Sequence, residues 1–93
     1  MARVTKSQID AMAVRFLNAR RAFGLDAEAE RIGVTAGSEL YGNSTTVTAY
    51  GSDYKILWQK CLNRSLSRAY DELREATMAL QDLRWELDRE GRP

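Results

Sequence analysis

The sequence predicts an α+β fold: a three-stranded antiparallel sheet (a meander) flanked by an N-terminal helix and a long C-terminal helix, in the order α-β-β-β-α. Near both ends of the chain, apolar residues recur every three or four positions, as on the buried face of a helix. In the middle, the period changes to two, which is typical of half-buried strands. The expected links between these strands are short, and short links join antiparallel neighbours. With 93 residues, the chain (1–93) is expected to form a single domain.

The first helix is predicted over residues 6–23. Thr5 and Gln8 have the spacing of a capping box, in which each side chain bonds to the backbone of the other residue. Gly24 is the residue type that most often ends a helix in a left-handed conformation. The apolar face of this helix consists of Ile9, Met12, Ala13, Phe16, Leu17 and Phe23.

The first two strands follow a short charged connection. Ile32, Val34 and Ala36 alternate with other residues, which predicts that they share the buried face of the first strand. Residues 42–44 have the glycine and asparagine composition of a turn. Residues 45–50 are rich in β-branched side chains and are expected to form the second strand.

The third strand is predicted over residues 54–59. Residues 51–52 are Gly-Ser, and this pair favours a tight type II′ reversal between the second and third strands. Strict alternation after that reversal places Tyr54, Ile56 and Trp58 on one face of the sheet.

The last helix is expected to begin near Ser65 or Ser67, since either serine can serve as its N-cap. It runs for about 20–25 residues, or roughly 30–37 Å, which is longer than a small sheet can cover. The end from Leu83 to Leu87, with Trp85, is therefore expected to project, and residues 90–93 to form a frayed tail. The apolar stripe of this helix is Leu62, Leu66, Tyr70, Leu73, Thr77, Leu80, Leu83 and Leu87.

Composition argues against several classes of function. The chain has no histidine, the usual proton shuttle and commonest metal ligand, and it has no phosphate-binding glycine motif. We therefore expect a non-enzymatic protein without cofactor or metal. The formal net charge of +1 lacks the basic excess of a typical nucleic-acid binder. Cys61 is the single cysteine, and no signal peptide or long apolar run occurs, so we expect a cytoplasmic protein without membrane insertion.

Four segments stand out by their order along the chain: Thr5–Asp10, Arg15–Asn18, Thr48–Leu57 and Ser67–Leu73. In these segments the chain resembles small orphan proteins of actinobacteriophages, mycobacteriophages in particular, a family without an assigned activity. The resemblance implies a protein that acts in the cytoplasm of the infected bacterial host by binding and inhibiting a host protein. Two features depart from the family: the final helix continues through Arg89, and residues 31–47 are expanded.

Protein binding through the C-terminal helix is the favoured function. Tryptophan and arginine are frequent anchors of interfaces, and an amphipathic helix docks readily into a groove or beside a coiled coil. The expected partner is a host protein, with coiled-coil character as one option. The residues predicted to bind it are Tyr70, Arg74, Thr77, Arg84, Trp85 and Arg89.

Two alternatives remain open at the level of sequence. The first is a small nucleic-acid-binding regulator that stacks bases on the sheet face and contacts phosphates with nearby basic residues. The second is a self-associating phage accessory protein that forms a homodimer through the same C-terminal helix. The residues on which the nucleic-acid alternative depends are Tyr50, Tyr54, Trp58, Lys55, Arg20, Arg21, Arg64 and Arg68.

Overall fold

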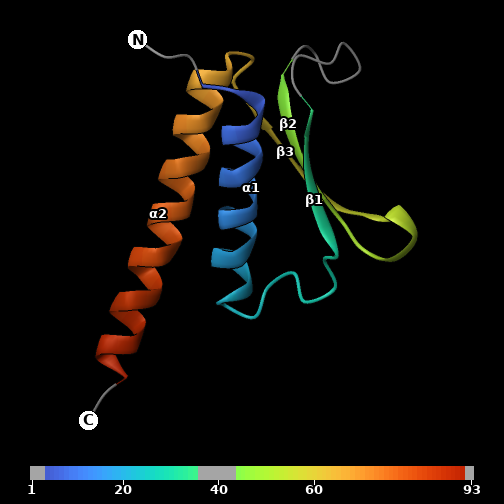
Figure 1. Ribbon diagram of the computed structural model, residues 1–93. Coiled ribbons are helices and arrows are strands. Elements are labelled where there is room, and N and C mark those ends of the chain that lie inside the picture. Colours follow the sequence, from blue (N-terminus) through green and yellow to red (C-terminus); the bar gives the residue numbers. More distant parts are fainter. Residues whose placement is uncertain (1–3, 36–43, 92–93) are drawn as a thin grey trace.

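The computed structural model describes residues 4–35 and 44–91, and its architecture is the predicted one (Figure 1). The three strands form one antiparallel sheet in the order β1-β2-β3. The order α-β-β-β-α is thus confirmed. The elements are α1 (Lys6–Arg21), β1 (Arg31–Thr35), β2 (Thr45–Tyr50), the 3-10 turn η2 (Ser52–Tyr54), β3 (Ile56–Leu62) and α2 (Leu66–Glu90).

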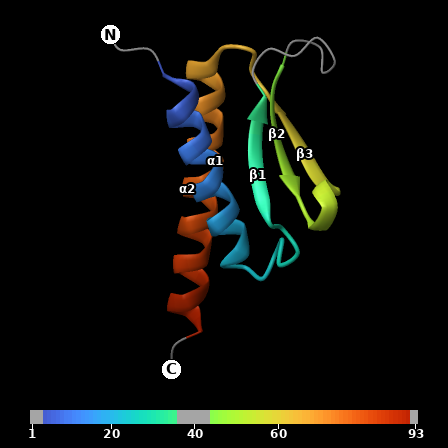
Figure 2. The ribbon, with the colours of Figure 1, turned by 45° about the vertical axis from the view of Figure 1, so that its right-hand side comes forward.

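The two helices lie on one side of the sheet and run side by side in the same direction (Figures 1 and 2), and α1 packs against both α2 and β1. This arrangement gives α1 two neighbours, so its buried arc is broad. The ribbon of α2 continues well past the end of α1 (Figure 1). The last turns of α2 therefore lack the helix that covers its first turns.

Helix α1 begins with the predicted capping box. The backbone N–H of Gln8 donates to Thr5 Oγ1 at 3.2 Å, and the backbone N–H of Thr5 donates to Gln8 Oε1 at 2.8 Å. The helix ends at Arg21, two residues before the predicted boundary, and residues 22–24 form a turn. Gly24 has a φ of 79°, the left-handed conformation expected of a residue that stops a helix.

The core lies between α1, α2 and the helix-facing side of the sheet. Thr77 and Leu73 of α2 are buried, and the Phe16 ring of α1 meets Trp58 of β3 edge to face, with centroids 5.9 Å apart. Because cross-strand neighbours share a face, Val34, Val47 and Lys60 point to the helix side together. The buried apolar cluster comprises Ile9, Met12, Ala13, Phe16, Val34, Val47, Leu62, Ala69 and Leu73.

The link between β2 and β3 differs from the predicted type II′ reversal. Residues 52–54 form η2, in which both Asp53 (φ 55°) and Tyr54 (φ 59°) adopt left-handed conformations. Tyr54 therefore precedes the third strand, which begins at Ile56. Ala36, Gly42 and Asn43, which the sequence assigned to a strand and a turn, lie outside the described residues.

A register shift makes the predicted common face of Tyr54, Ile56 and Trp58 wrong. Ala49 pairs with Trp58 whereas Tyr50 pairs with Ile56, so β3 accommodates one extra residue between them. An extra residue reverses the alternation of side chains beyond it. Trp58 consequently packs under α1, while Ile56, which is 51% exposed, lies on the opposite face.

Helix α2 begins at Leu66, with Ser65 as its N-cap residue, although the Ser65 side chain makes no capping hydrogen bond. Its 25 residues give a length of about 37 Å, at the upper end of the expected range. The helix ends at Glu90, the first residue of the predicted frayed tail 90–93, of which Arg92 and Pro93 lie outside the described residues.

The loop between α1 and β1 is fastened by the Asp26 carboxylate. It accepts hydrogen bonds from Arg20 Nε at 2.5 Å and from Trp58 Nε1 at 3.0 Å, and only 8% of the Asp26 side chain is exposed. The Arg20 guanidinium also stacks 5.0 Å from the Trp58 ring. One carboxylate thus links the end of α1, the loop and β3. Asp26 has a φ of 56°, a conformation that aspartate and asparagine tolerate better than most residues.

We expect Asp26→Ala to lower the free energy of unfolding by about 2–3 kcal/mol, because two partly buried donors lose their acceptor and alanine resists a positive φ. Asp26→Asn should cost about 1 kcal/mol, because the amide oxygen still accepts from Trp58. Urea unfolding measures both. Exposed Glu28, in the same loop, is the control: Glu28→Ala should change stability by less than about 0.5 kcal/mol. Equal losses for Asp26→Ala and Glu28→Ala would contradict the role given to Asp26.

Candidate protein-binding site on the C-terminal helix

The end of α2 stands clear of the other elements. The Arg84 guanidinium donates a hydrogen bond to the Ala22 carbonyl oxygen, just after the last residue of α1. Beyond that contact, α2 continues to Glu90 without α1 beside it (Figure 1). Residues 83–90 are called the projecting segment below. Three of its large apolar residues are exposed: Leu83 (47%), Trp85 (62%) and Leu87 (50%).

These exposed residues point in different directions. Leu87 follows buried Leu73 by 14 residues, which leaves it about 40° away around the helix axis, so it continues the buried face of α2 past the end of α1. Trp85 lies on a different side, about 160° from Leu83. Met78, 47% exposed, lies seven residues before Trp85 and therefore shares its side. The projecting segment thus carries two separate apolar edges.

Trp85 is presented together with a cation. The Arg89 guanidinium lies 5.2 Å from the centroid of the Trp85 ring, one helical turn further on. A cation over an aromatic face is a weak attraction at exposed sites, about 0.5–1 kcal/mol. It holds the two side chains together as one amphipathic feature on the surface. The sequence prediction named both residues.

Two of the predicted partner-binding residues belong to the interior instead. Thr77 is 1% exposed, and its hydroxyl donates to the Leu73 carbonyl oxygen at 2.8 Å, so it is removed from the site. Thr77 lies one turn after Leu73 and is buried on the same face of α2. Tyr70 is half-buried and packs against the core cluster.

Arg84 was also predicted to bind a partner, but the structure gives it an internal role. Besides its bond to the Ala22 carbonyl, its Nε lies 3.7 Å from Asp88 Oδ2. Arg84 therefore joins α2 to the end of α1. Of the predicted set, Arg74, Arg84, Trp85 and Arg89 are exposed, and the structure adds Met78, which its spacing from Trp85 would have revealed.

The structure separates the residues on which the nucleic-acid alternative depended. Trp58 is packed under α1, and Arg20 is bound to Asp26. Arg21 donates to the Ala29 carbonyl oxygen. These three side chains are engaged in the fold, so they are not presented together on an open face.

A smaller aromatic cluster does remain at the η2 end of the sheet. Tyr54 is 66% exposed and meets the Tyr50 ring at 6.4 Å, and Arg31 Nη1 donates to the Tyr54 hydroxyl at 3.0 Å. The acidic side chains of Glu30 and Asp53 line the pocket beside it. Two tyrosines and one arginine among carboxylates form a limited platform for a nucleic acid.

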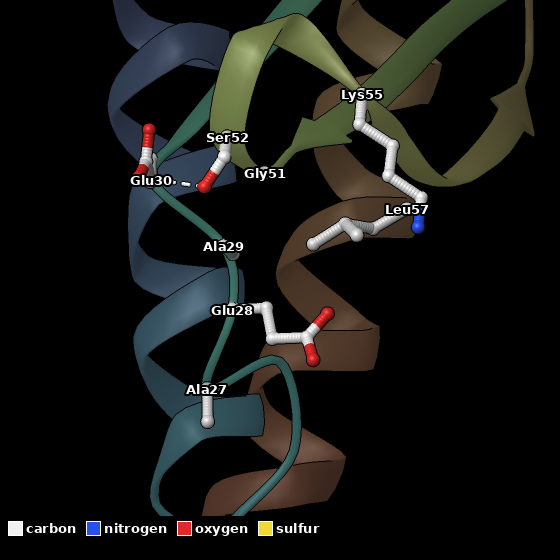
Figure 3. Close-up of a pocket in the computed structure, with 8 residues that line it drawn as sticks. All are labelled: Ala27, Glu28, Ala29, Glu30, Gly51, Ser52, Lys55 and Leu57. Atoms are coloured by element: carbon white, nitrogen blue, oxygen red, sulfur yellow. Dashed lines mark hydrogen bonds between the residues drawn. The ribbon is translucent and has the colours of Figure 1, made fainter.

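An open groove lies between the α1–β1 loop and the β2–β3 link (Figure 3). Its volume is about 500 Å³, and the Ser52 hydroxyl donates to Glu30 Oε1 across it at 3.3 Å. Within residues 4–35 and 44–91, no group of three or more histidine, cysteine, aspartate or glutamate side chains is arranged to hold a metal ion. The lining residues are Ala27, Glu28, Ala29, Glu30, Gly51, Ser52, Lys55 and Leu57.

Comparison with known proteins adds no family: no protein-family model, curated protein or solved structure matches the chain. Among the helices described, none has the length and apolar character needed to cross a membrane.

The different roles of the two arginines in the projecting segment are testable. Arg84→Ala should lower the free energy of unfolding by about 0.5–1 kcal/mol, because α2 loses its bond to the Ala22 carbonyl at a partly solvated position. Arg89 lies about 1.4 helical turns beyond Arg84, so Arg89→Ala should change the free energy of unfolding by less than about 0.5 kcal/mol. Urea unfolding of the two variants decides the matter, and equal effects would overturn the internal role of Arg84.

Proposed function

We propose that this chain is a non-enzymatic, phage-encoded protein that binds a protein of its bacterial host, and modulates it, through the projecting segment of α2. The observation that carries the proposal is the exposure of Trp85 on the part of α2 that extends beyond α1. Its side chain is 62% exposed, and the Arg89 guanidinium stacks on its ring. The proposed place of action is the cytoplasm of the infected host.

The distribution of exposed apolar surface supports this proposal. Core contacts of α2 are made by residues up to about Leu80, so the last turns add little to folding. Burying a leucine or tryptophan side chain is worth roughly 1.5–3 kcal/mol, and that free energy is left for a partner to gain. Interfaces are commonly anchored by such residues, with tryptophan and arginine prominent among them.

The directions of the apolar edges favour a groove over a second copy of the chain. A flat helix-to-helix contact covers one side of α2, whereas Leu83 and Trp85 point about 160° apart. A groove receives a helix from two sides at once. Self-association remains the alternative, and the experiment below separates the two.

The test is capture of a partner by the tagged protein from a nuclease-treated actinobacterial lysate, with mass spectrometry of the retained proteins. We expect one dominant host protein, whose retention falls at least 30-fold with Trp85→Ala/Arg89→Glu, because truncating a central anchor costs about 2 kcal/mol or more. Both residues are exposed, so circular dichroism and urea unfolding should show an intact fold.

Val14→Ala is the matched control, because Val14 is 48% exposed on α1, away from the projecting segment. This variant should retain the partner fully. Undiminished retention by folded Trp85→Ala/Arg89→Glu would rule out the projecting segment as the site. Capture that disappears with nuclease would favour the nucleic-acid alternative, and recovery of the bait alone as a dimer would favour self-association.

A further inference from the structure

The projecting segment, together with Asp82 just before it, has a negative net charge, although the net charge of the whole chain is +1. Residues 82–90 contain four carboxylates and two arginines, a formal charge of −2. Both arginines are already occupied: Arg84 bonds to the Ala22 carbonyl, and Arg89 stacks on Trp85. The surface that α2 offers at this end is therefore dominated by carboxylates, which are Asp82, Glu86, Asp88 and Glu90.

Three of these carboxylates form a ridge between the two apolar edges. Asp82, Glu86 and Glu90 follow one another at intervals of four residues, so they lie along one line of the helix surface. Helical geometry places this line between the Leu83–Leu87 edge and Trp85. All three side chains are exposed, and none makes a hydrogen bond or ion pair within residues 4–35 and 44–91.

The carboxylates near the end of α2 destabilise the helix electrostatically. The last carbonyl groups of a helix carry partial negative charge, so carboxylates near its C-terminus are unfavourable. Glu86, Asp88 and Glu90 all lie in the last two turns of α2. A sequence that breaks a local rule without a compensating contact in the fold does so most often where it binds something.

From this charge pattern we infer that the partner of the projecting segment is a protein whose binding groove has apolar walls and a floor of lysine and arginine side chains. The inference rests on the proposed function and specifies its partner. The walls receive the Leu83–Leu87 edge and Trp85, and the basic floor meets Asp82, Glu86 and Glu90. Complementary charge of this kind accelerates association and selects among partners.

The experiment uses two synthetic amphipathic helical peptides as probes, one of leucine and lysine and one of leucine and glutamate. Each is titrated into the full-length ¹⁵N-labelled protein, and amide shifts map where it binds. We expect the leucine–lysine peptide to shift amides of residues 78–90 and the leucine–glutamate peptide to leave them unchanged. Binding of the leucine–lysine peptide should weaken at least tenfold in Asp82→Lys/Glu86→Lys.

The matched control is Asp71→Lys/Glu75→Lys. It makes the same change of charge at the same spacing on the same helix, also at exposed positions, and should leave binding at residues 78–90 within twofold. Asp82→Lys/Glu86→Lys should fold at least as stably as the native chain, since lysine near a helix C-terminus is favourable. Equal weakening by the two variants, or peptide shifts centred elsewhere, would overturn the inference.

These outcomes are independent of the lysate experiment. If capture depends on Trp85 but the leucine–lysine peptide does not shift the amides of residues 78–90, the proposed function stands and the inferred basic binding groove of the partner is wrong. If the peptide binds there but capture does not depend on Trp85, the proposed function is wrong.

Discussion

The carboxylate of Asp26 is the constraint on which the rest of the structure depends. It accepts hydrogen bonds from Arg20 at the end of α1 and from Trp58 of β3. Trp58 follows Asp26 by 32 residues, so this contact ties the loop after α1 to the sheet. The same contact seats Trp58 beneath Phe16, which fixes how α1 lies on the sheet. With α1 fixed and ended at Arg21, the longer α2 has no neighbour for its final turns. The exposed site on α2 is a consequence of that mismatch in length.

The end of α1 also affects how the charges of the site are paired. A helix C-terminus leaves carbonyl groups without intrahelical partners, and arginine side chains are suited to satisfy them. Here Arg84 reaches the Ala22 carbonyl from α2, and Arg21 reaches the Ala29 carbonyl in the following loop. Because Arg84 is engaged in this contact and lies beside Asp88, it does not pair with Asp82, Glu86 or Glu90. The contact that satisfies the end of α1 therefore leaves the acidic ridge without a cation partner among the described residues.

Local sequence signals predicted the helices and strands. Two features could not be predicted, the bulge in β3 and the contact of Arg84 with a residue far away in the sequence. The capping box of Thr5 and Gln8 involves neighbours in sequence, and it was predicted correctly. The bulge beside Ile56 was not, because a single extra residue leaves no compositional trace yet reverses the sheet face. Arg84 was assigned to a partner because its acceptor lies 62 residues away. The projection of the helix end that carries Trp85 was predicted because the apolar stripe of the last helix is longer than a small sheet can cover.

The last turns of α2 have little tertiary support, which bears on the proposed binding. Helix ends are prone to fraying, and here one contact with the end of α1, from Arg84 to the Ala22 carbonyl, and two local pairs support these turns. The Arg84–Asp88 pair contributes about 0.2–0.5 kcal/mol and the Arg89–Trp85 pair about 0.5–1 kcal/mol. A partner that envelops the segment supplies the missing packing, so part of the binding free energy is spent on ordering the helix. Affinity then depends on helix propensity at exposed positions as well as on contacts, whereas the stability of the fold depends little on any residue of the segment except Arg84.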